Sequence, residues 1–251
     1  MYFQLLNRGS YCWSLGELDE ERQEFHRHTV KMLSPLLLGG AEILETLAEL
    51  KTTDEFLVRD CLDIARTIAF RFLDYALSAF ALAIETWQLT PDAENENRLK
   101  KIIDDTTKLS QLFSSILASA EEFSLYHSLE NLKKTAEVNP IFEDTLKRTA
   151  VSHYCRSFIY EPAKYCYEAE WQHIAHLAQK CIAENNTRPW RGMLTDLENA
   201  DAAIIEAYAE RTLADMRPDT LQAKKDLPGV LKQTAAIARS INEKEVSYVI
   251  F

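Results

Sequence analysis

The sequence predicts an all-α protein, a bundle of long antiparallel helices. Gly and Pro are scarce, with 6 and 7 among 251 residues, which disfavours sandwiches and barrels with many tight turns. Apolar residues recur at steps of three and four over long stretches, the period of one helix face. We therefore expect a single α-helical domain over residues 1–251, although this length also allows two packed helical layers.

The N-terminal third predicts three helices. Residues 19–50 favour two helices interrupted near Ser34, Pro35 and the Gly39–Gly40 pair, because proline breaks a helix interior. The next helix is predicted from Thr53 to about Gln88, with Thr53 as its N-cap and acidic residues in its first turn.

The middle of the chain continues the same pattern. A helix from about Asn95 to Glu122 is expected to return antiparallel to the preceding one. Further helical segments follow, and Asn139 is the predicted N-cap of one of them. Pro162 lies inside an apolar periodic run, where it should kink the helix or divide it, with the second part continuing to Glu184.

The C-terminal part predicts two more helices, from Gly192 to Leu213 and from about Leu227 to Glu243, separated by "DMRPD". The terminal "VSYVIF" is β-branched and aromatic and could be a short strand or an extended tail. A single terminal strand would leave the all-α class unchanged.

Charge and cysteine content narrow the function classes. The net charge of −11 and the absence of a basic cluster argue against a nucleic-acid partner, which is bound through basic patches. The five cysteines form no CxxC pair, so free thiols and a reducing, cytoplasmic compartment are favoured over a disulfide framework. No secretory signal is recognisable in this chain, and the sequence leaves the localisation otherwise open.

The most apolar window, Thr67 to Trp87, is about long enough to span a bilayer. Arg71 and Asp74 lie inside it, and a charge at membrane depth costs roughly 2.5 to 3.5 kcal/mol. We interpret the window as a helix buried in a soluble core and predict no membrane span.

A charged row marks the helix around "RDCLDIAR". Asp60, Asp63 and Arg66 follow one another at steps of three, and Arg59 and Asp63 make an i, i+4 pair. Charges on a largely buried helix must be paired or face a cleft. We interpret the four as structural ion pairs, with direct ligand contact as the alternative.

A second polar row has metal-ligand residue types. Glu170, His173 and His176 form ExxHxxH along one side of a helix. Carboxylate-bridged di-iron bundles need an ExxH on each of two helices, and the second ExxH is missing here. We interpret the row as a polar stripe, keep a metal site as the alternative, and expect no cofactor.

Three segments in order resemble the C-terminal all-helical domain of the α-N-acetylglucosaminidase family of glycoside hydrolases. They are "FLVRDCLDIARTIAFRFLDYAL", similar to that family's DxxDxxR helix through Asp60, Asp63 and Arg66, then "ILASAEEFSLYHSLENLKKTA", and "SHYCRSFIYEP". The third stands where the family has an aromatic segment ending in Trp, Gly, Pro, and the tryptophan is replaced here by Ile159 and Tyr160.

The resemblance implies a helical accessory domain, or a fragment, of a glycoside hydrolase. In that family a preceding (β/α)₈ barrel carries the catalytic carboxylates, and the helical domain closes one side of the sugar cleft. The barrel pattern is absent from this sequence, and residues 1–16 could be the remnant of a junction to it. We therefore expect no catalytic residue in this chain, and carbohydrate as the partner through the upstream domain.

The residues around Pro162 supply side chains suited to sugar binding. Aromatic faces, guanidinium and carboxylate groups hold sugars through their C–H groups and hydroxyls, so Tyr154, Arg156, Tyr160 and Glu161 are the expected substrate-binding wall. The competing hypothesis is a non-enzymatic helical interaction module or a metal-binding helical bundle. The oligomeric state is not predicted.

Overall fold

The computed structural model describes residues 20–139, 141–152, 158–187 and 194–245. The all-α prediction is confirmed: every regular element within these ranges is helical. The remnant proposed for residues 1–16, and the extended segment proposed for the C-terminus, which lies in residues 246–251, fall outside the described residues. The elements are α2 (Glu20–Glu49), α3 (Glu55–Leu89), α4 (Ala93–Ala118), the 3₁₀ turn η2 (Glu121–Phe123), α5 (Leu125–Lys133), α6 (Ile141–Ser152), α7 (Tyr160–Pro162), the π-helical turn η4 (Ala163–Tyr167), α8 (Glu168–Ala183), α9 (Leu194–Glu210) and α10 (Thr220–Glu245).

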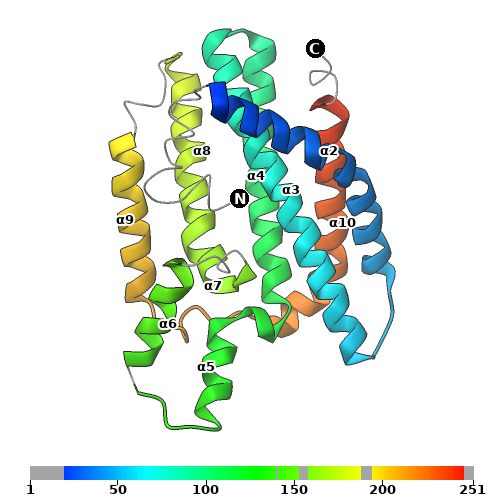
Figure 1. Cartoon of the computed structure of the whole chain (residues 1–251), viewed down its shortest axis with the longest axis vertical. Helices are drawn as coiled ribbons and strands as arrows, with labels where there is room; N and C mark the ends of the chain where they lie inside the picture. The colour runs from blue at the N-terminus through cyan, green and yellow to red at the C-terminus, as the bar shows by residue number, and fades with distance from the viewer. Residues whose placement is uncertain (1–19, 140, 153–157, 188–193, 246–251) are drawn as a thin grey trace.

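Four long helices enclose the main part of the core. α2 packs on α3, α3 on α4, α4 on α10, and α10 returns to α2. The four helices form a ring, and Figure 1 shows that each of them runs antiparallel to its two neighbours in it. The helices α8 and α9 lie beside α4, on the side that faces away from α10. The facing sides of these four helices bury large apolar side chains, among them Phe72, Phe80, Trp87 and Phe113.

Trp171 ties α8 to the ring of four helices. Its indole meets the ring of Phe80 edge-on at a centroid distance of 5.0 Å, and its Nε1 donates a hydrogen bond to Thr107 Oγ1 at 2.9 Å. The indole is 1% exposed, so this single side chain joins α8 to both α3 and α4.

The structure corrects the predicted break in the first helical region. α2 is one continuous helix with Pro35 inside it, and α10 begins at Thr220, seven residues before the predicted start, with Pro228 inside it. Both prolines are exposed, so their rings face solvent, where a helix tolerates bending. Apolar residues of the same helices, such as Leu37 in α2 and Leu231 in α10, are buried, and their packing offsets the lost hydrogen bond.

Gly40 allows close approach of α2 to α3. A Cβ at this position would lie 2.9 Å from the Phe72 ring and 3.0 Å from Ile68 Cγ2, whereas a Cβ at Gly39 would meet nothing within 4 Å. The two neighbouring glycines therefore have different roles, and only Gly40 is required by packing.

Two predicted helix ends are also corrected. The N-cap of α3 is Asp54, not Thr53, because the Asp54 carboxylate accepts from the backbone N–H groups of Phe56 and Leu57. α4 ends at Ala118, where Ser119 Oγ donates to the carbonyl of Ile116, so the predicted extension to Glu122 is a separate 3₁₀ turn.

The region of Pro162 is divided differently from the prediction. α6 ends at Ser152, and a new helical segment begins at Tyr160, so Pro162 falls in a first turn, where its missing N–H costs no hydrogen bond. A π-helical turn follows at Ala163–Tyr167 and leads into α8. The expected division is therefore present, but Tyr160, where the first part was expected to end, is where the second part begins.

One described helix, α3, is long and apolar enough to cross a membrane by length and composition. Within its 18-residue apolar window, 78% is buried inside the protein. Asp74 lies in this helix with its side chain 0% exposed, and Arg71 at the surface makes an ion pair with it at 3.4 Å. The core helix of a soluble protein has the same composition, and the absence of a membrane span stays a prediction.

Candidate functional site

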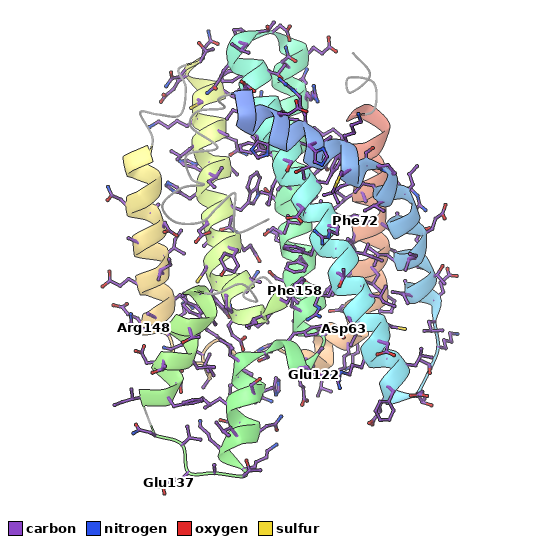
Figure 2. The ribbon with its side chains drawn as sticks, in the orientation of Figure 1. Asp63, Phe72, Glu122, Glu137, Arg148 and Phe158 are labelled. Carbon is purple, nitrogen blue, oxygen red and sulfur yellow. The ribbon has the colours of Figure 1, made fainter. Side chains whose placement is uncertain are left out.

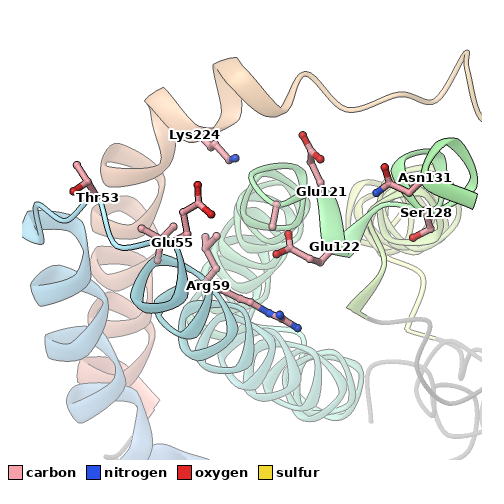
Figure 3. A pocket seen from close by; sticks show the side chains of 11 residues that line it. Thr53, Glu55, Arg59, Glu121, Glu122, Ser128, Asn131 and Lys224 are labelled. Atoms are coloured by element: carbon pink, nitrogen blue, oxygen red, sulfur yellow. The ribbon is translucent and has the colours of Figure 1, made fainter. Parts of the chain in front are cut away.

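A polar cleft lies where the start of α3, the end of α4 with η2, the helix α5 and the start of α10 come together. Its volume is about 730 Å³. Figure 3 shows Glu55 and Lys224 on one side of this cleft, Ser128 and Asn131 on the other, and Glu121 and Glu122 between them. A cavity of this size is in the range of small-molecule sites.

The lining of the cleft is rich in groups that form charged hydrogen bonds. Three carboxylates, from Glu55, Glu121 and Glu122, face two cations, Arg59 and Lys224. Asn131 adds an amide that can both donate and accept. Ser128 adds a hydroxyl that donates to the carbonyl of Ser124 at 2.9 Å and has lone pairs left to accept. Val58, Leu62 and Ala120 give the cleft an apolar part of nearly the same extent as its polar part. The arrangement suits a ligand that presents several hydroxyl groups and no net negative charge.

Arg66 holds the η2 wall of the cleft against α3. Its guanidinium lies 4.5 Å from the centroid of the Phe123 ring and 4.6 Å from that of the Phe158 ring, and it pairs with Asp63 at 2.9 Å. Each cation–π contact is worth about 0.5 to 2 kcal/mol, depending on desolvation. Because Phe123 directly follows Glu122 in η2, Arg66 fixes the position of the acidic residues.

The predicted ion-pair row is only partly formed. The structure pairs Asp63 with Arg66. Arg59 and Asp60 are exposed, and in the described parts of the chain neither has an oppositely charged side chain within 4.0 Å. Arg59 instead lines the cleft, so direct ligand contact, the alternative for this row, stays a prediction for Arg59.

Glu161 lies in the interior, with 0% of its surface exposed. Its Oε1 accepts hydrogen bonds from Ser124 Oγ at 2.6 Å and from the N–H of Tyr126 at 3.0 Å, and its Oε2 accepts from the N–H of Leu125 at 2.8 Å. These donors form the N-terminus of α5, where a negative charge is favoured. Glu161 therefore fixes α5, which carries Ser128 and Asn131, and does not face an open cleft.

The other members of the expected substrate wall are placed as follows. Tyr154 and Arg156 lie outside the described residues. Tyr160 is half-buried and meets Tyr165 edge-on at 6.3 Å. Burial, together with the neighbouring Tyr165, raises the pKa of the Tyr160 phenol above its ordinary value. Tyr160 and Glu161 do not line the 730 Å³ cleft.

The ExxHxxH row is spread over different environments. Glu170 is buried, His173 is half-buried and His176 is exposed. In the part of the chain that the structure describes, no three His, Cys, Asp or Glu side chains converge to hold a metal ion. The metal alternative for Glu170, His173 and His176 therefore has no support in the geometry.

Sequence reasoning missed most of the cleft. Glu121 and Glu122 lie in the short break between α4 and α5, which the sequence analysis had assigned to a helix end. Lys224 is about a hundred residues away along the chain and carries no local motif. The sequence signal for this part of the cleft was the pair of adjacent acids, Glu121 and Glu122, next to a helix end. Such pairs are common on solvent-exposed surfaces, so this one did not single out a site.

The chain was compared with protein-family models, curated proteins and solved structures. No family model, no curated protein and no solved structure matches it.

Proposed function

We propose that the chain is the helical accessory domain of a glycoside hydrolase, which binds carbohydrate in the polar cleft and leaves bond cleavage to a catalytic domain of the parent protein. This proposal is supported by the contacts that join the three segments that resemble the family. Arg66 from the first segment lies between Phe123 from the second and Phe158 from the third. Glu161 from the third segment holds the start of α5 in the second.

The described residues that line the cleft supply the polar groups of a sugar site, without an aromatic face among them. Carboxylates accept hydrogen bonds from sugar hydroxyls, and Arg and Lys donate to ring and glycosidic oxygens, with charge-assisted bonds stronger than neutral ones. Asn131 and Ser128 on α5 can bridge adjacent hydroxyls. The single observation that carries the proposal is this 730 Å³ cleft, built by the first two resembling segments together with Lys224 of α10.

Binding to the purified chain tests the proposal. We expect methyl N-acetyl-α-D-glucosaminide, or another sugar of a glycan panel, to bind measurably in a calorimetric titration. Asn131→Ala and Glu122→Gln should weaken this binding at least tenfold, whereas Glu137→Gln, at the exposed loop after α5 (Figure 2), should not change it. The chain alone should not hydrolyse an aryl glycoside. If no sugar of the panel binds at millimolar concentration, the proposal fails.

A second function, that of a helical interaction module, is favoured by the outward face of α2. Met32, Leu36, Ile43 and Leu50 recur at heptad-compatible spacing and are 46 to 56% exposed. A partner helix packed on this stripe would cover them. Sedimentation equilibrium of the wild type and of Ile43→Glu tests this function: identical monomer masses, with no partner retained by either, would remove it.

A further inference from the structure

An apolar pocket adjoins the polar cleft. Its volume is about 180 Å³, and it lies between the end of α2, the first part of α3 and the start of α10. Its lining is mainly aliphatic and includes Leu47, Ala48, Leu227 and Leu231, together with the free thiol of the half-buried Cys61. An apolar pocket of this kind gains free energy by taking apolar surface out of water.

The two cavities meet along one side of α3. Val58, Leu62 and Lys224 line both of them. A lysine at such a boundary can place its aliphatic stem on the apolar side and its amino group on the polar side. Figure 3 shows the amino group of Lys224 directed toward the side of the cleft that carries Glu121. A molecule held in the cleft therefore has an apolar surface within reach.

Size and charge define what the pocket can take. A volume of 180 Å³ corresponds to about six water molecules at roughly 30 Å³ each, enough for an aryl ring or a short alkyl chain and too little for a lipid tail. Three carboxylates against two cations line the cleft, and the chain carries a net charge of −11, so an anionic head group is disfavoured.

We propose that the apolar pocket is the subsite for the aglycone, so that the two cavities together bind a neutral glycoside with a short alkyl or aryl group. This inference rests on the proposed carbohydrate function of the cleft and adds the chemical class of the ligand. The sugar hydroxyls meet Glu121, Glu122 and Asn131, the glycosidic oxygen lies near Lys224, and the aglycone packs on Leu227 and Leu231.

Calorimetric titrations with methyl and hexyl N-acetyl-α-D-glucosaminide test the subsite. Each buried methylene tightens binding on the order of fourfold, so the hexyl glycoside should bind at least tenfold more tightly than the methyl glycoside. Ala48→Phe fills the pocket and should abolish this difference. The matched control Ala207→Phe, at an exposed position of α9, should retain it.

Alkylation of Cys61 in the wild-type protein gives an independent readout, followed by mass spectrometry of the labelled peptide. The hexyl glycoside and 1-hexanol should slow the labelling of Cys61 by N-ethylmaleimide, and the methyl glycoside should not. Because this measurement needs no variant, it holds even if Ala48→Phe does not fold.

The outcomes separate the two proposals. If both glycosides bind equally and Cys61 is not protected, the aglycone subsite is refuted and the carbohydrate function stands. If 1-hexanol protects Cys61 as well as the hexyl glycoside does and no sugar of the glycan panel binds, the cleft contributes nothing. That result refutes both the carbohydrate function and the glycoside assignment.

Discussion

Replacing Glu161 tests the claim that this buried carboxylate holds helix α5 in place. The carboxylate accepts three hydrogen bonds, from Ser124 Oγ and from the N–H groups of Leu125 and Tyr126, at 2.6 to 3.0 Å. In Glu161→Gln the amide oxygen can still accept from two of these donors, but the amide nitrogen cannot accept from the third. The substitution thus leaves one donor without an acceptor and removes the charge.

The expected cost follows from these two losses. A hydrogen bond to a charged group contributes about 1.5 to 3 kcal/mol, and a charge at a partly buried helix N-terminus contributes up to about 2 kcal/mol. We therefore expect Glu161→Gln to lower the free energy of unfolding by about 2 to 4 kcal/mol. Glu161→Ala leaves all three donors without an acceptor and should cost more.

Urea unfolding and amide hydrogen exchange measure the effect. The exchange protection of Leu125 and Tyr126 should fall in Glu161→Gln, because their N–H groups bond to this carboxylate. The control Glu137→Gln, at an exposed position, should change neither quantity. Unchanged protection of both amides, with an unfolding free energy within about 0.5 kcal/mol of the wild type, would refute the reasoning.

Three further predictions concern stability. Burial lowers the pKa of His26 from 6.5 to about 4, so the unfolded chain takes up a proton below pH 6.5 that the folded chain does not bind until about pH 4. The wild type should therefore lose about 3 kcal/mol of unfolding free energy through this site when the pH falls across this window, and His26→Leu should not. The control His28→Leu, at an exposed position, should lose as much as the wild type. Equal losses in urea titrations of His26→Leu and the wild type would contradict this. Gly40→Ala should destabilise the protein by about 1 to 3 kcal/mol through overpacking. Gly39→Ala, with open space at its Cβ, should stabilise it by up to about 1 kcal/mol. Unfolding midpoints that move in the opposite order would show the reasoning to be wrong. Arg66→Leu should cost about 1 to 3 kcal/mol by losing two cation–π contacts and an ion pair, and a thermal melt equal to that of the wild type would refute this role.

The fold class could be predicted from the sequence because helical periodicity is a local signal. The apolar stripe that includes Phe72, Phe80 and Trp87 is buried as its spacing requires. The errors came from rules that tertiary packing overrides. Pro35 was expected to interrupt a helix, yet it lies on the exposed face of α2, whose opposite face is packed into the core.

The candidate site was less predictable, because it depends on which segments meet in space. Arg66 was identified from the spacing of its charged row, but no local pattern shows that Phe123 and Phe158 lie on either side of it. Glu161 was predicted to bind substrate, whereas the structure buries it and bonds its carboxylate to the start of α5. Its donors lie 35 to 37 residues earlier, so its role at the start of α5 is visible only in the fold.

The central claim, that the polar cleft binds carbohydrate, is tested most directly by amide chemical shifts during a titration with methyl N-acetyl-α-D-glucosaminide. The account predicts that the shifts gather on the described residues lining the cleft, with the largest at Glu121, Glu122 and Asn131. The absence of any change at millimolar sugar, or changes confined to residues away from the cleft, would contradict it.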